Sequence, residues 1–258
     1  MKGKALLKKT SVAVAVCVCV ALQVGATNAQ QAAKPGDPQA VLSMALDSLD
    51  RLELKVVSGA GGDAVQAKGD IARFTGRRSL HMINDDSLMA AQSPSGGESL
   101  AIVKGSDFKD GTIEVDVIGM PRQGSNSESR GFVGIAFRIQ GDVEKFENFY
   151  LRFTNGRADD QLRRNHSVQY TSFPDHPWSR LRKENPGVYE SYVDIEEKAW
   201  TKIKVVVSGT KARLYVNGAA QPCLIVNDLR LEPAQGGVAL WVGPGTEGYF
   251  SNLKVTAR

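Results

Sequence analysis

Cysteine is scarce in this chain, and its placement excludes an intramolecular disulfide in the folded domain. Cys17 and Cys19 lie in an N-terminal apolar run, and only Cys223 lies beyond it. One remaining cysteine has no partner within the chain, so we expect the hydrophobic core to hold the fold. We interpret Cys223 as a buried bystander.

Histidine is equally rare, which argues against a zinc site. His81, His166 and His176 are scattered, and no pair has the i, i+4 spacing of a helical zinc site. Calcium binding remains an alternative at Asn84–Asp86 or Asp159–Asp160, because hard cations prefer oxygen ligands. We expect these acids to be solvated loop residues, and we predict no cofactor and no metal site. A phosphate-binding glycine loop and a nucleophile elbow are also missing.

Long apolar runs are confined to the N-terminus. Four lysines precede an apolar run over Ser11–Ala26, which is too short and wrongly flanked for a stable membrane span. Thr27 and Ala29 supply small residues at the −3 and −1 positions of a cleavage site. We predict a signal peptide over residues 1–29 and a secreted or periplasmic protein. An uncleaved membrane anchor is the alternative.

The rest of the chain has no excess of charge of either sign. The sequence has 32 basic and 28 acidic residues, and residues 1–29 contain four lysines and no acid. The remainder is therefore balanced, which argues against a nucleic-acid partner held by bulk charge.

The sequence also has no long helical pattern and no internal repeat. We predict a flexible lead-in or short helix over residues 30–50, because the apolar spacing of Val41–Leu54 suits a helix. Beyond it the pattern has period two. The predicted strands are Ile71–Ile83 (two strands around Gly76), Leu100–Val103, Thr112–Ile118, Phe132–Ile139, Asn148–Thr154, Thr201–Val207, Ala212–Val216, Gly237–Val242 and Tyr249–Val255. Many short strands with Gly and Asn turns predict an all-β, two-sheet antiparallel jelly-roll sandwich over residues 51–258.

Several segments together resemble the concanavalin A-like lectin/glucanase superfamily. Phe108–Val117 (FKDGTIEVDV) is similar to its opening strand, and Trp200–Val205 with Ala212–Gly218 resembles the hairpin of laminin G-like members. Gly236–Trp241 and Tyr249–Val255 resemble the closing strands. The resemblance implies two curved antiparallel sheets with a concave face. Because the superfamily hosts lectins, glycosidases, lyases and adhesion modules, the fold does not decide the function.

The chain is also similar to bacterial 3-keto-disaccharide hydrolase-like domains. That group usually has a carboxylate in the strand where this chain has Tyr150-Leu151-Arg152. Glu114 and Asp116 offer two carboxylates on one strand face, roughly 7 Å apart, a spacing relevant to glycoside hydrolysis. Gly119 stands where the pattern of family 16 glucanases has a further Glu, so we favour a solvated strand face.

Arg138, Tyr150 and Arg152 lie opposite the apolar phase of their strands and would share one surface if those strands are neighbours. The planar donors of Arg suit carboxylates, and Tyr adds a flat face. This set would suit a uronate or another acidic glycan; a surface ion-pair network is the alternative.

Residues 155–192 form a long polar segment rich in aromatic side chains, which indicates a functional loop. Its candidate sugar-binding and catalytic groups are Arg163, Arg164, His166, Gln169, Tyr170, His176, Trp178, Arg180 and Arg182. Trp178 could stack on a sugar ring, and His166 could act as a general base. Alternatively, Trp178 and Tyr170 pack the segment against the sandwich.

Three hypotheses follow. The first is a secreted carbohydrate-binding protein whose site lies on the concave face, with Arg138, Tyr150, Arg152, Arg164, Gln169 and Trp178 binding the ligand. The second is a saccharide-degrading hydrolase or lyase with His166 or Tyr170 as base and Arg152 stabilising developing charge. The third is an adhesion or structural module without a small ligand.

Overall fold

A computed structural model describes residues 40–57, 67–84 and 97–258. The predicted signal peptide, residues 30–39 of the lead-in, and Asp85 and Asp86 of one candidate calcium site lie outside these residues. Within them, no helix has the length and apolar character needed to cross a membrane.

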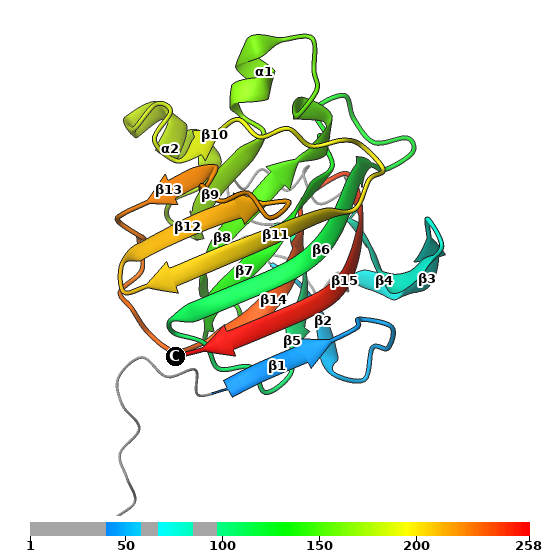
Figure 1. The fold of residues 1–258 in the computed structure, drawn as a ribbon, viewed down its shortest axis with the longest axis vertical. Helices are drawn as coiled ribbons and strands as arrows, with labels where there is room; N and C mark the ends of the chain where they lie inside the picture. The colour runs from blue at the N-terminus through cyan, green and yellow to red at the C-terminus, as the bar shows by residue number, and fades with distance from the viewer. Residues whose placement is uncertain (1–39, 58–66, 85–96) are drawn as a thin grey trace, which may run out of the picture. The chain divides into compact units, whose positions relative to one another are not determined.

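Two antiparallel sheets pack as a sandwich (Figure 1). Across the first, called sheet A, the strands are β13 (Leu224–Val226), β12 (Lys211–Val216), β11 (Thr201–Ser208), β6 (Gly111–Pro121), β15 (Thr246–Ala257), β4 (Arg77–Asn84) and β3 (Lys68–Phe74), and β1 (Ala40–Met44) also pairs with β15. Across sheet B they are β10 (Glu190–Ser191), β9 (Val168–Phe173), β8 (Lys145–Arg152), β7 (Phe132–Gln140), β14 (Gly237–Val242), β5 (Ser99–Val103) and β2 (Leu52–Val56).

The core lies between the sheets because successive side chains of a strand point to opposite faces. Sheet A contributes Ile113, Val115 and Val117 of β6 to this core, and sheet B contributes Ile135 and Phe137 of β7. Burial of each such side chain contributes roughly 1.5–3 kcal/mol. The predicted all-β jelly-roll sandwich and its period-two strands are confirmed.

The short helix predicted within residues 30–50 is wrong, because Ala40–Met44 forms strand β1. Ala40–Met44 pairs with the end of β15, and Leu52–Val56 pairs with β5. The helical spacing over the whole stretch hides the alternation within β1, where Leu42 and Met44 pack against the core and Val41 is exposed. Without β1 and β2, part of β15 and one side of β5 would lack backbone hydrogen-bond partners. Pairing with them favours the extended conformation of this stretch.

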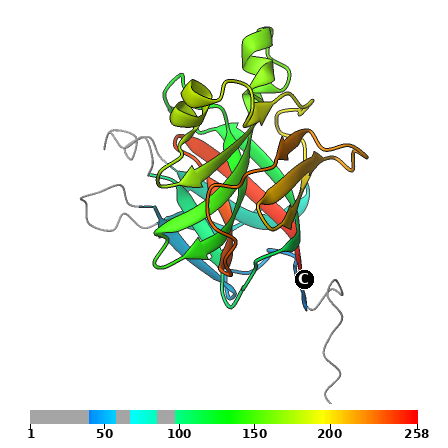
Figure 2. The same cartoon turned by 90° about the vertical axis from the view of Figure 1, so that its left-hand side faces the viewer.

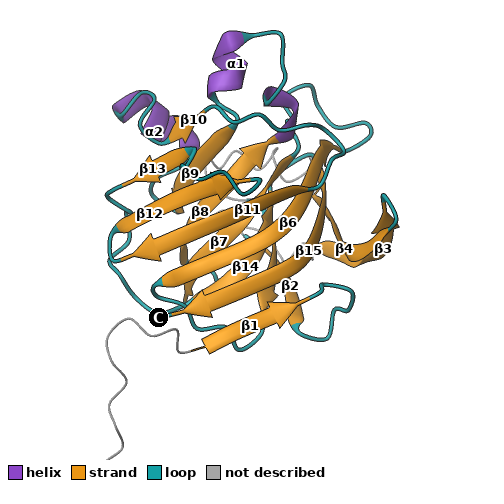
Figure 3. Ribbon diagram, in the orientation of Figure 1, coloured by secondary structure: helices purple, strands orange, loops and turns teal. Residues whose placement is uncertain are grey.

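The 155–192 segment, for which no regular structure was predicted, contains two short helices and two strands. Helix α1 (Gln161–Asn165) and helix α2 (Trp178–Glu184) flank β9, which pairs with β8 and so extends sheet B. In Figures 1 and 2 both helices lie at one end of the sandwich, and Figure 3 shows the described helical structure gathered there, including the 3-10 turn η2 (Phe153–Asn155). This segment therefore supplies the edge strands β9 and β10 of sheet B and the helices at one end of the sandwich.

A β-bulge at Arg138 reverses the alternation of β7. The pairing of β7 with each of its neighbours, β8 and β14, shifts register at this point, and Arg138 has a φ of 54°. Its side chain is 0% exposed and donates to the carbonyls of Lys109 and Gly209 and to the carboxylate of Asp110. The prediction that Arg138 shares a surface with Tyr150 and Arg152 is therefore wrong, because the extra residue turns it to the opposite face.

Candidate functional site

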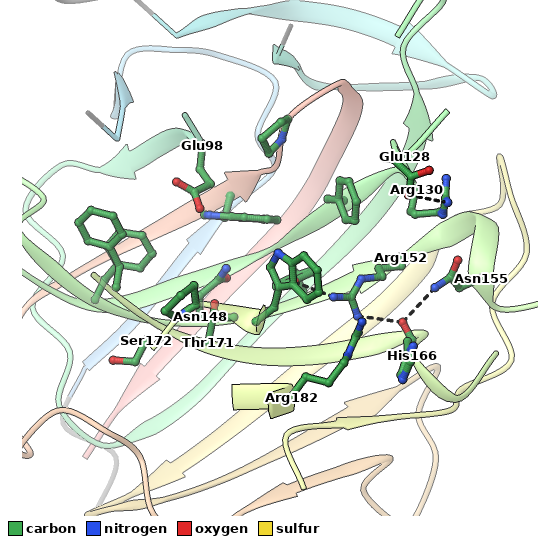
Figure 4. A pocket seen from close by; sticks show the side chains of 18 of the residues that line it. Glu98, Glu128, Arg130, Asn148, Arg152, Asn155, His166, Thr171, Ser172 and Arg182 are labelled. Carbon is green, nitrogen blue, oxygen red and sulfur yellow. Dashed lines mark hydrogen bonds and ion pairs between the residues drawn. The ribbon is translucent and has the colours of Figure 1, made fainter. Parts of the chain in front are cut away.

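A cavity of about 630 Å³ opens on the face of sheet B that points away from the core (Figure 4). We call it the sheet B cavity. It is lined by Glu98, Glu128, Arg130, Phe132, Phe146, Asn148, Tyr150, Arg152, Asn155, Arg163, His166, Thr171, Ser172, Phe173, Pro177, Trp178, Arg182, Trp241 and Pro244.

Strand β8 supplies the central row of this lining. Asn148, Tyr150 and Arg152 face the cavity, and Phe149 and Leu151 between them are buried in the inter-sheet core. Arg152 also packs over the ring of Tyr150, with its Cζ 5.1 Å from the ring centroid. The period-two alternation predicted for this strand thus brings a cation and an aromatic ring together in the cavity.

Tyr150 and Trp241 form an aromatic platform on the cavity floor. Their rings stack at 4.8 Å with an interplanar angle of 27°, and Phe132 meets Tyr150 edge-on at 6.1 Å. Gly134 of β7 lies between them in register, opposite both Tyr150 and Trp241. A Cβ at Gly134 would lie 2.6 Å from the Tyr150 Cβ, so the missing side chain is what allows the two rings to meet.

Arg152 is a buried cation whose partners are all neutral. It is 6% exposed and donates to the His166 carbonyl at 3.0 Å, the Tyr150 hydroxyl at 3.0 Å and the Gln169 Oε1 at 3.1 Å. Among the described residues it forms no ion pair. Burial lowers the pKa of Arg152, but arginine keeps its proton in proteins. The cavity therefore holds a positive charge that no carboxylate of the described residues neutralises at contact distance.

Gln169 positions this guanidinium from behind. It is buried, and its Nε2 donates to the carbonyls of Tyr170 at 2.9 Å and Tyr189 at 3.1 Å. These bonds leave Oε1 directed at Arg152. Gln169 thus acts through Arg152 and is not part of the cavity lining.

A second arginine, Arg163, also lacks an acidic partner among the described residues. The Asp160 carboxylate accepts from the Arg163 backbone N–H at 3.0 Å and caps helix α1. The Arg163 guanidinium donates to Asn155 Oδ1 at 3.4 Å and to the carbonyl and hydroxyl of Thr154 at 3.3 Å. In contrast, Arg130 pairs with Glu128 at 3.2 Å.

Glu190 joins Arg182 and His166 at the margin of the cavity. Its carboxylate accepts from Arg182 Nε at 3.0 Å and from Nη2 at 2.7 Å, and it lies 3.1 Å from His166 Nε2. Burial lowers the pKa of His166, and the neighbouring arginines add to this effect, whereas Glu190 opposes it. The lowered pKa favours a neutral imidazole at pH 7, as a general base requires.

Trp178 is the exposed aromatic of the cavity. It is the first residue of α2 and is 44% exposed, and the Arg182 guanidinium lies 4.8 Å from its ring centroid. Its position at the cavity agrees with the sequence-based prediction, but it is held there by a helix that the sequence did not indicate.

Four other predicted residues, Arg164, Tyr170, His176 and Arg180, do not line the cavity. Tyr170 lies in the inward phase of β9, where its hydroxyl donates to the buried Glu147 carboxylate at 2.7 Å; burial and Glu147 raise the pKa of Tyr170 well above its usual value. Arg164 donates to the Tyr192 hydroxyl at 2.7 Å. Of the two residues predicted as alternative bases, His166 therefore lines the cavity, whereas Tyr170 points into the inter-sheet core.

The other carboxylates singled out in the sequence also lie away from the cavity. Asp116 of β6 accepts from Arg77 at 2.8 Å and from Asn252 at 2.7 Å in sheet A. Asp160 caps α1, and the described residues contain no cluster of three or more potential metal ligands.

The sequence reasoning missed Asn148, Phe132 and Trp241. Asn148 is in phase with Tyr150 and Arg152, so the alternation of β8 would have indicated it. Trp241 reaches the site only through the strand order β8-β7-β14, which one sequence does not reveal.

Comparison with solved structures defines the class of fold. A carbohydrate-binding module from Bacillus subtilis, CBM66, matches with a TM-score of 0.50 and 14% identity, over 80% of this chain and 98% of that one. A B. subtilis protein of unknown function with a galectin-like fold matches with a TM-score of 0.50 and 11% identity, over 86% of this chain and 99% of that one. No protein-family model and no curated protein matches the chain.

These likenesses establish the fold and nothing finer. The described part of the chain is a two-sheet antiparallel jelly-roll sandwich, the fold that these structures share with it.

Proposed function

We propose that this chain is a carbohydrate-binding protein whose sheet B cavity takes an acidic saccharide. The observation that carries the proposal is Arg152, a buried guanidinium that lines an aromatic-floored cavity without a carboxylate partner. A uronate or sulfate group would supply the missing negative charge through charge-assisted hydrogen bonds.

The remaining lining suits the same ligand. The flat faces of Tyr150 and Trp241 offer an apolar surface to a sugar ring, and Arg163 adds a second cation without an acidic partner. The fold supports the same class of function, since one of its structural neighbours is a carbohydrate-binding module. We also propose that the N-terminal segment exports the domain, so that the saccharide is met outside the cytoplasm.

The test is a binding series with matched arginine variants. Affinity electrophoresis and calorimetry would compare polygalacturonate and alginate with neutral polymers such as dextran. We expect binding to the acidic polymers, weakened about tenfold by Arg163→Gln, since a hydrogen bond to a charged group contributes about 1.5–3 kcal/mol. Arg164→Gln is the control, because Arg164 lies on the same helix but bonds Tyr192.

Two results would contradict the proposal. One is an absence of binding to every acidic saccharide on a glycan array, which would leave an adhesion or structural module. The other is equal weakening by Arg163→Gln and Arg164→Gln.

A second candidate is a lyase or hydrolase acting on the same saccharide. The observation that favours it is His166, which lines the cavity and whose pKa is lowered by burial. New reducing ends or an unsaturated uronate product, both lost in His166→Gln, would favour this enzyme over a binding protein.

A further inference from the structure

Two of the polar groups that line the sheet B cavity are neutral and have no hydrogen-bond partner among the described residues. Asn148 is 1% exposed, and its Oδ1 has no hydrogen-bond partner among the described residues. Trp241 is 4% exposed, and its indole Nε1 also lacks a partner there. Both residues line the cavity, and Figure 4 shows Asn148 away from the cluster formed by Arg152, Asn155 and His166.

Unpartnered polar atoms of this kind are costly. A polar group that is buried without a partner loses its hydrogen bonds to water and gains none in return, and most buried groups in folded proteins are therefore paired. Nothing in the packing of β8 demands an amide at position 148, since no hydrogen bond joins the Asn148 side chain to another described residue. The pair is therefore suited to a ligand group that can both donate and accept.

The chemistry of these two groups suits the hydroxyls of a neutral sugar. Asn148 Oδ1 accepts and Trp241 Nε1 donates, and sugar hydroxyls can both donate and accept. A carboxylate could accept from Trp241 or from the Asn148 amide N–H, but these neutral groups would not compensate its charge as an arginine does. Arg152 and Arg163 offer donors only, so that part of the cavity favours an anionic group.

The two ends are separated along one strand. Asn148 and Arg152 are four residues apart on β8 and on the same face, so their Cα atoms lie about 13 Å apart. Tyr150 lies between them and carries the stack with Trp241. This arrangement is longer than a single pyranose residue.

We propose that the cavity reads a mixed saccharide of at least two residues, with an acidic sugar at Arg152 and Arg163 and a neutral sugar at Asn148 and Trp241. The inference rests on the proposed function and adds which end of the bound saccharide is acidic and which end is neutral.

The test uses three probes: free galacturonic acid, digalacturonic acid, and aldobiouronic acids that join one uronic acid to one neutral hexose in either order. We expect one order of the mixed disaccharide to bind about tenfold more tightly than digalacturonic acid. Asn148→Leu should remove this preference and leave the affinity for galacturonic acid unchanged. Arg163→Gln should weaken all acidic probes alike.

The variant is expected to fold, because replacing an unpartnered buried amide by an apolar group of similar size is neutral or stabilising. Thermal unfolding of Asn148→Leu would confirm this. Ser79→Ala is the matched control, since Ser79 Oγ is also buried without a partner but lies on β4 of sheet A; it should leave every affinity unchanged.

Equal affinity for digalacturonic acid and both mixed disaccharides would overturn the inference while the acidic-saccharide function stands. A folded Asn148→Leu variant with an unchanged preference would do the same. Failure of all the acidic probes to bind would overturn the proposed function together with the inference.

Discussion

Tyr150 and Trp241 lie on strands that are not neighbours, and yet their rings stack at 4.8 Å above the strand between them. Gly134 occupies the middle position of this row. The aromatic platform thus depends on a residue that contributes no side chain to it.

Gly134→Ala should destabilise the protein and disrupt the cavity together. The new Cβ would lie 2.1 Å from the Phe149 carbonyl oxygen and 2.6 Å from the Tyr150 Cβ. Overpacking of this kind costs about 1–3 kcal/mol, measurable by urea unfolding. Gly237→Ala is the control, because its nearest contact would be an ordinary 3.5 Å; equal effects of the two changes would contradict this account.

Arg138→Met should lower stability without changing saccharide affinity. The change removes buried hydrogen bonds from Arg138 to Asp110 and to two backbone carbonyls, with an expected loss of about 1.5–3 kcal/mol. Chemical unfolding and calorimetric titration would separate the two effects. A loss of affinity in a variant that remains folded would show that Arg138 contributes to binding after all.

Glu190→Gln should lower the pKa of His166 further. The carboxylate of Glu190 favours the charged imidazole and so raises the pKa of His166 against the stronger effect of burial. Removing that negative charge leaves burial and the nearby arginines, which all act downward. The pH titration of the His166 ring protons by NMR would measure the shift. Glu184→Gln is the control, because Glu184 pairs with Arg180; an upward or absent shift in Glu190→Gln would contradict the assignment.

Trp178→Ala should abolish most saccharide binding and leave the fold intact. The side chain is 44% exposed, so its removal should change stability little, whereas a stacked aromatic contributes about 0.5–1.5 kcal/mol beyond its buried area. Calorimetry and thermal unfolding would test both parts. Trp200→Ala serves as the comparison, since Trp200 packs under Arg77 of β4 in sheet A and should not affect affinity.

The sequence predicted the strands well because period-two alternation is a local property. It predicted that Tyr150 and Arg152 lie opposite the apolar side of β8, and both line the cavity. It failed at Arg138, because a single bulged residue inverts the phase and leaves no sign in the composition.

The 155–192 segment was harder to predict for a different reason. None of its helices and strands is longer than seven residues. Helices of this length depend on tertiary contacts for their stability. The sequence leaves Tyr170 either as a sugar-binding or catalytic group or as a packing residue, and the structure confirms the second, because β9 turns it toward Glu147 in the core. The pairing of Trp241 with Tyr150 depends on strand order, which a single sequence does not reveal.

The two halves of the cavity have separate structural origins. The stacked rings of Tyr150 and Trp241 come from β8 and β14 in the body of sheet B, whereas Arg163, Trp178 and Arg182 come from helices at its end. Exchanging the helical segment would alter the cations and the exposed indole offered to a ligand, while the Tyr150–Trp241 platform stays in place. A domain built this way can acquire a new sugar preference without having to refold its scaffold.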